Sequence, residues 1–171
     1  MCRAFVFSFV LLAVSCASAQ TADSRIPSFA ATALSSKKVT SDALIGQPTI
    51  LIVTPSKGAA DDTRKWAKAL RKNIDQSAVR IRDVLAIDLP FFMSESDAIG
   101  RAKEKIPPRY YDQTWILDGS VLEKALNIPP GSHDAFVFVL NKEGKSVARV
   151  AGGPTDERVG EVQSAVARTK S

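Results

Sequence analysis

Cysteine is nearly absent from this chain. The sequence contains two cysteines, Cys2 and Cys16, and none from residue 20 to residue 171. Disulfide exchange and thiol-dependent peroxide reduction both require a thiolate as the attacking group. Residues 20–171 therefore carry neither chemistry, and we do not expect this part of the chain to be a thiol-disulfide oxidoreductase or a peroxidase.

Histidine is also scarce, because His133 is the only one. A single histidine excludes a metal site built from several imidazole ligands. The aspartates lack the spacing of a calcium loop, and no glycine-rich phosphate-binding loop precedes the predicted helices. We expect no metal and no cofactor.

Long apolar runs are absent after the first residues. Residues 4–14 are apolar, follow Arg3 and precede the small residues Ala17-Ser18-Ala19. This arrangement is typical of a secretory signal peptide cleaved after Ala19, and the run is short for a transmembrane helix. We predict a signal peptide at residues 1–19, one domain at residues 20–171, no transmembrane segment, and a periplasmic or secreted protein.

An alternative interpretation of the same segment stays open. Residues 12–16, Leu-Ala-Val-Ser-Cys, are similar to a bacterial lipobox, in which Cys16 would carry a lipid anchor to the membrane. Ala13 stands where leucine is usual. Intact-mass measurement of the exported form distinguishes lipidation from removal of Cys16.

Charge of one sign does not accumulate along the chain. The net charge is +5, from 23 Lys and Arg against 18 Asp and Glu, and the two signs alternate. This pattern is typical of an ordinary solvated surface, and we expect no nucleic-acid partner.

The stretch most informative about the fold follows Pro48. Residues Thr49–Thr54 are mostly β-branched and apolar, a Ser/Gly turn comes next, and apolar residues then recur at helical spacing. A second apolar run at residues 79–88 completes a βαβ unit, which implies parallel strands joined by a right-handed crossover. The predicted face of the helix comprises Ala59, Thr63, Trp66, Ala67, Leu70 and Ile74.

The remaining elements follow local signals. We interpret residues 26–46 as a lead-in to the first core strand, with a turn at residues 35–38. Phe91 and Phe92 are predicted to belong to a packed insertion. Three helix starts are predicted, at Ser94, at a Ser120/Glu123 capping box and at Thr155, and two strands, at residues 135–140 and 145–150, flank a hairpin turn.

These segments together resemble the thioredoxin-like superfamily, in particular its TlpA and peroxiredoxin-type branch. The similar pieces are Ile26-Pro27-Ser28-Phe29, residues 44–47 and residues 136–145. The insertion after residue 88 and the helix at Thr155 are most similar to YtfJ-like periplasmic proteins. The resemblance implies an α/β fold with a central mixed sheet flanked by helices.

The resemblance also shows two departures. The two-cysteine motif of the superfamily would fall near Lys57-Gly58-Ala59-Ala60, so Lys57 and Ala60 stand where thiols would be. Its cis-proline would fall near Ser132-His133-Asp134, where no proline occurs.

Five residues are candidates for a binding site, and we assign no catalytic residue. A helix N-terminus can hold an anion, although an ordinary helix start is the alternative and Asp61 and Asp62 oppose an anion. The leading hypothesis is an accessory module for a peptide, protein or small-molecule ligand. Alternatives are an enzyme using His133 and Lys57, and a structural lipoprotein. The candidates are Thr54, Ser56, Lys57, His133 and Asp134.

Overall fold

The computed structural model describes residues 25–87 and 94–169. The predicted signal peptide, its Cys16 alternative, and Phe91 and Phe92 of the predicted insertion lie outside these ranges. No helix within the described ranges is both long and apolar enough to cross a bilayer.

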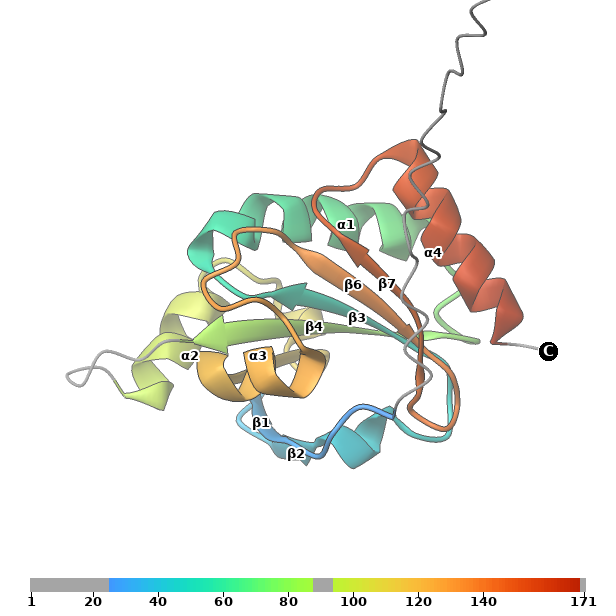
Figure 1. The fold of residues 1–171 in the computed structure, drawn as a ribbon. Helices are drawn as coiled ribbons and strands as arrows, with labels where there is room; N and C mark the ends of the chain where they lie inside the picture. Colours follow the sequence, from blue (N-terminus) through green and yellow to red (C-terminus); the bar gives the residue numbers. More distant parts are fainter. Residues whose placement is uncertain (1–24, 88–93, 170–171) are drawn as a thin grey trace, which may run out of the picture.

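The described residues form a mixed sheet of seven strands in the order β2-β1-β5-β4-β3-β6-β7 (Figure 1). Strand β3 pairs in parallel with β4, and β4 in parallel with β5, whereas the other pairings are antiparallel. The predicted mixed sheet and its parallel βαβ unit are confirmed. The strands are β1 (Ala30–Ala33), β2 (Lys38–Thr40), β3 (Thr49–Thr54), β4 (Arg80–Ile87), β5 (Thr114–Asp118), β6 (Phe136–Leu140) and β7 (Ser146–Ala151).

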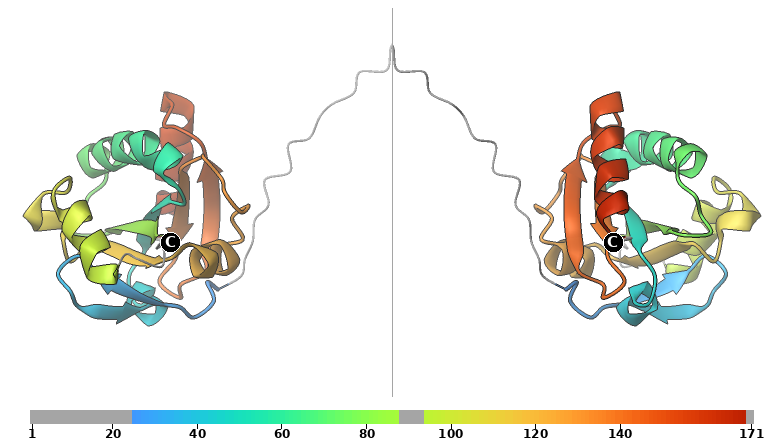
Figure 2. Two further views of the ribbon diagram at one scale, coloured as in Figure 1. Left: turned by 90° about the vertical axis from the view of Figure 1, so that its left-hand side faces the viewer. Right: turned by 90° about the vertical axis from the view of Figure 1, so that its right-hand side faces the viewer.

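Helices flank the sheet on both faces. Helices α1 and α4 lie on one side and α3 on the other, as Figure 2 shows from two directions. The described residues also contain three short 3-10 helices, at Ser41–Leu44, Lys57–Ala59 and Pro108–Tyr110. Within the described ranges the four α-helices are α1 (Ala60–Asn73), α2 (Glu95–Lys103), α3 (Gly119–Leu126) and α4 (Asp156–Arg168).

Strand β3 supplies both halves of the core. All six of its residues are buried. Ile50 and Ile52 point toward α1 and α4, whereas Leu51 and Val53 point to the opposite face. Successive side chains of a strand alternate between faces, so a strand covered on both sides must be apolar throughout.

The segment before β3 differs from its prediction. Strands β1 and β2 form an antiparallel hairpin at the edge of the sheet, and β1 also pairs with β5. Strand β1 reads Ala-Ala-Thr-Ala, which lacks the branched apolar residues that mark a strand in a sequence. Pairing with β5 therefore decides its structure. The prediction of a lead-in named neither strand, whereas the predicted turn at residues 35–38 overlaps the turn that joins them.

Two of the three predicted helix starts are confirmed. The Ser94 side chain accepts a hydrogen bond from the backbone N–H of Asp97, and Thr155 accepts one from Arg158. The predicted Ser120/Glu123 capping box was wrong, because Asp118 caps α3. The Asp118 carboxylate accepts hydrogen bonds from the Ser120 and Val121 amides, at 2.9 and 3.3 Å.

Replacing Asp118 tests whether its side chain caps α3. We expect Asp118→Ala to lower the free energy of unfolding by about 1 kcal/mol near neutral pH. Hydrogen bonds from the Ser120 side chain and the Val121 amide lower the Asp118 pKa. A lowered folded-state pKa stabilises the protein above the unfolded pKa, and this stabilisation is lost as the pH falls through the folded value.

Urea unfolding of both proteins near pH 7 and near pH 3 measures the effect. The difference between wild type and Asp118→Ala should shrink at the lower pH. The control is Glu161→Ala on the exposed side of α4, which should show no such trend. An Asp118→Ala difference that is equal at the two pH values would contradict the capping role.

Candidate functional site

The turn between β3 and α1 begins with Ser56 in an extended conformation. Lys57–Ala59 then form a 3-10 turn that leads directly into α1 at Ala60, with the Ala59 amide donating to the Ser56 carbonyl at 3.2 Å. The Lys57 side chain is exposed. The turn therefore presents a cation next to the backbone amides that start the helix.

Thr54 has a structural role at this turn. Its side chain is buried and its hydroxyl donates to the Thr63 hydroxyl at 3.0 Å. The Thr63 hydroxyl donates in turn to the Ala59 carbonyl at 2.9 Å. This chain of hydrogen bonds ties the end of β3 to the first turn of α1, so the Thr54 proton is already used inside the protein.

The Ser56 hydroxyl, unlike that of Thr54, is not used in a hydrogen bond with any described residue. Its oxygen is buried. A buried hydroxyl without a partner is unfavourable by a free energy of about 1–3 kcal/mol. Such a group can be satisfied by a bound polar atom, which makes Ser56 the clearest binding candidate among the five.

His133 lies directly against the turn. A Cβ atom placed on Gly58 would be 2.4 Å from Nδ1 of His133 and 3.2 Å from its Cγ. The loop before β6 and the turn before α1 are therefore in contact, with the imidazole over Gly58. Within the described residues, the His133 ring makes no hydrogen bond, and neighbouring Asp134 is exposed and forms no ion pair with it.

Gly58 tests this contact. We expect Gly58→Ala to displace the His133 ring and to lower the free energy of unfolding by about 1 kcal/mol, because the new methyl group cannot fit beneath the ring. Adding His133→Ala should remove most of that loss. Chemical unfolding and the NMR signals of the imidazole measure both effects.

The control for this test is Gly100→Ala in α2, where an added Cβ meets nothing within 4 Å. This change should stabilise the helix by about 0.5–1 kcal/mol. Additive effects of Gly58→Ala and His133→Ala would show that the two residues do not touch.

The structure contains a cavity of about 580 Å³ that the sequence analysis did not identify. It lies between α1, β4 and residues 102–110, and we call it the α1 groove. Of the five candidates, only Thr54 lines it. Its apolar lining comprises Ala60, Ala67, Leu85, Ala102, Ile106, Pro107 and Tyr110, and its cations are Arg64, Lys68, Arg71, Lys72, Lys105 and Arg109.

One buried ion pair fixes the floor of the α1 groove. Arg71 contacts Asp83 at 2.5 Å, and the two side chains are 10% and 13% exposed. Burial raises the Asp83 pKa, and the attraction of Arg71 opposes this rise. The Arg71 guanidinium also lies 4.4 Å from the ring centre of Tyr110. Arg71, on α1, thereby contacts β4 through Asp83 and residues 102–110 through Tyr110.

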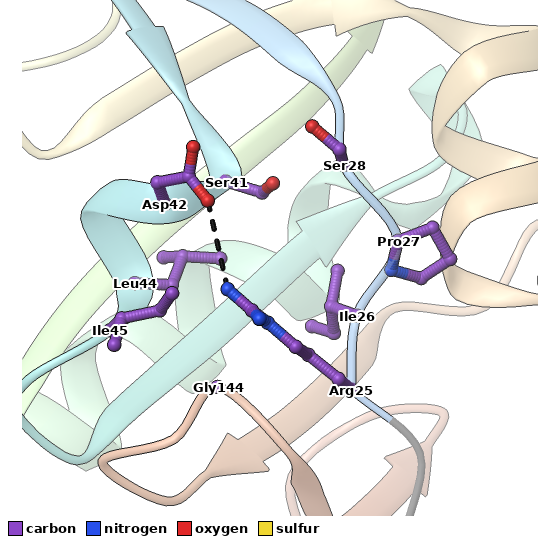
Figure 3. Close-up of a pocket in the computed structure, with 9 residues that line it drawn as sticks. All are labelled: Arg25, Ile26, Pro27, Ser28, Ser41, Asp42, Leu44, Ile45 and Gly144. Atoms are coloured by element: carbon purple, nitrogen blue, oxygen red, sulfur yellow. Dashed lines mark ion pairs between the residues drawn. The ribbon is translucent and has the colours of Figure 1, made fainter.

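A second cavity, of about 430 Å³, lies near the start of β3 and thus far from the β3–α1 turn (Figure 3). Arg25 and Asp42 face each other across it at 3.7 Å, and both side chains are well exposed. Exposed ion pairs contribute little to stability. The Ile26 amide donates to the Gly144 carbonyl at 3.2 Å, so this region serves to seat the N-terminal segment on the β6–β7 hairpin.

No group of three or more histidine, aspartate, glutamate or cysteine side chains that could hold a metal ion occurs in the described part of the chain. Likewise, that part contains no cis peptide bond, and the backbone before β6 is trans.

Comparison with known proteins identifies the fold. No family profile matches the sequence, and no curated protein matches it. Solved structures do match. The exposed lipoprotein thioredoxin of Streptococcus pneumoniae strain TIGR4 is 14% identical with a TM-score of 0.57, over 81% of this chain and 98% of that one.

Two further structures agree with the first. The thioredoxin domain of a thiol-disulfide oxidoreductase from Bacteroides vulgatus is 18% identical, with a TM-score of 0.60 over 85% of this chain and 97% of that one. A member of the Sco family of cytochrome c oxidase assembly proteins is 14% identical, with a TM-score of 0.59 over 86% of this chain and 96% of that one. The chain has the thioredoxin-like fold, and at these identities the similarity carries no activity.

Proposed function

We propose that this protein is an exported binding or accessory module of the cell envelope, built on a thioredoxin-like fold and without thiol redox activity. Residues 1–19 direct export, with lipidation of Cys16 as the alternative. The binding surface is the β3–α1 turn with the loop before β6. It comprises Ser56, Lys57, His133 and Asp134, with Thr54 supporting it from beneath.

The contact between His133 and Gly58 carries this proposal. It brings an imidazole and the exposed Lys57 ammonium to one surface, with the unpartnered Ser56 hydroxyl buried just beneath them. These groups donate hydrogen bonds, and none is a thiol. A carboxylate, such as the C-terminus of a peptide, is the complementary ligand chemistry, because Arg64 and Lys65 pair with Asp61 and Asp62 and offset their repulsion.

A peptide with a free carboxylate tests the proposal. We expect N-acetyl-trialanine to shift the backbone amide NMR signals of the turn and of the loop before β6, and its C-terminal amide to bind more weakly. Lys57→Ala and His133→Ala should each weaken binding by about tenfold, in line with the loss of one charge-assisted hydrogen bond.

Lys142→Ala is the matched control, because this exposed lysine lies in the hairpin at the opposite end of the sheet. It should leave the titration unchanged. The absence of any shift at the turn, or shifts that persist in Lys57→Ala and His133→Ala, would contradict the proposed binding surface.

A further inference from the structure

The α1 groove has the size and lining of a binding site. Ligand sites are clefts of about 300–1,000 Å³ with mostly apolar walls and a few polar groups. The α1 groove has about 580 Å³, and its apolar residues Ala67, Leu85, Ala102 and Ile106 are only half-buried. These side chains leave apolar surface available to an occupant.

Cations follow both rims of the α1 groove. Arg64, Lys68 and Lys72 are four residues apart on α1, so they form a row of about 12 Å along one rim. Lys105 and Arg109 stand on the opposite rim, in the segment that lies next to α1 in Figure 2. Among the described residues, Asp83 is the only carboxylate that lines the groove, and Arg71 already neutralises it.

Three of these cations are available to an anionic partner, whereas Arg64 already pairs with Asp61. Lys68, Lys72 and Lys105 are exposed and form no ion pair with any other described residue. Arg71 is committed to Asp83 through both terminal nitrogens, so the exposed lysines supply the charge that a partner would meet.

We propose that the α1 groove binds an acidic amphipathic segment of a partner protein. Its apolar side chains enter between α1 and Ile106, and its carboxylates pair with the lysines of both rims. A fatty acid has one charge at one end and would satisfy only one cation, whereas charges along both rims match a segment with acidic residues on either side of an apolar face. Residues 20–171 carry 22 Lys and Arg against 18 Asp and Glu, and this net charge of +4 also favours an acidic partner.

A designed peptide tests this proposal in the exported form of the protein. The probe is a fluorescein-labelled peptide of about 12 residues made of leucine and glutamate, with leucines at i, i+3, i+4 and i+7. Its counterpart carries lysine in place of each glutamate. Fluorescence anisotropy should detect the glutamate peptide in the micromolar range, with weaker binding at higher salt, and should detect no binding of the lysine peptide.

Charge reversal locates the site. The double variant Lys68→Glu with Lys105→Glu changes one cation on each rim and should weaken binding by at least about tenfold. The control double variant, Lys124→Glu with Lys142→Glu, has the same net charge but changes exposed lysines outside the groove, and should bind within about twofold of wild type. Ile106→Ser should weaken binding without changing its salt dependence.

Three results would overturn the proposal. They are the absence of binding by the glutamate peptide, equal losses in the groove and control variants, and displacement of the peptide by laurate at a lower concentration than by unlabelled peptide. Lys57→Ala should leave binding of the glutamate peptide intact, so this test is independent of the proposed surface at the β3–α1 turn.

Discussion

Replacing Lys57 and Ala60 together by cysteine should give the exported protein a reversible disulfide and a measurable rate of insulin reduction. Ala60 is the first residue of α1 and Lys57 begins the 3-10 turn before it, so both changes lie at a helix N-terminus. That position stabilises a thiolate and lowers the pKa of a cysteine placed there. The fold would then contribute geometry that the natural side chains do not use.

The rate of insulin precipitation in the presence of dithiothreitol measures this gain. The double variant should exceed wild type by at least about tenfold, because a neighbouring second thiol resolves the mixed disulfide intramolecularly and therefore fast. The single variant Lys57→Cys is the control and should form mixed disulfides that only dithiothreitol resolves, with turnover well below that of the double variant. A double variant that stays reduced in oxidised glutathione would show that this turn is not equivalent to the redox turn of the superfamily.

Arg71→Met should cause the largest loss of stability among the single changes considered, about 3–5 kcal/mol in the free energy of unfolding near neutral pH. Its removal leaves the Asp83 carboxylate buried without a counterion. The loss should fall steeply as the pH drops toward about 4, the unfolded pKa of an aspartate, and should disappear below it, where the carboxyl is protonated in both states. This sign follows because burial already raises the Asp83 pKa above its unfolded value.

Guanidinium unfolding at several pH values measures the effect of Arg71→Met. Adding Asp83→Asn should recover part of the loss, since the buried charge is then removed. The exposed pair of Arg25 and Asp42 provides the control, and Asp42→Asn should change the free energy of unfolding by less than about 0.5 kcal/mol. If Arg71→Met also changed the free energy of unfolding by less than about 0.5 kcal/mol, this result would contradict the proposed contribution of the buried pair to stability.

The parts of the fold that could be predicted are those with local signals. The unbroken apolar run from Ile50 to Val53 predicts a strand buried on both faces. Ser94 and Thr155 predict helix starts, because their side chains accept hydrogen bonds from the first turn. Strand β1 could not be predicted, because its Ala-Ala-Thr-Ala sequence becomes a strand only by pairing with β5. The cap of α3 was placed two residues late, because Ser120 and Asp118 carry equally good capping side chains.

The β3–α1 turn and the α1 groove also differ in how far the sequence could predict them. Proximity of His133 to the turn could be expected only through the resemblance to a known fold, since 75 residues separate it from Gly58 in sequence. The α1 groove could not be predicted, because it depends on the distance between α1 and residues 102–110, which no periodicity encodes. The spacing of Arg64, Lys68 and Lys72 was visible, but it is equally typical of a solvated helix face.

The claim on which this account depends is that a thioredoxin-like fold operates here without thiol chemistry. Its most direct test is the insulin-reduction rate of the protein purified in its exported form, with intact mass and thiol titration of the same sample. We predict a rate equal to that of dithiothreitol alone and no titratable thiol. A rate above that background, or an exchangeable thiol in the exported chain, would contradict the claim.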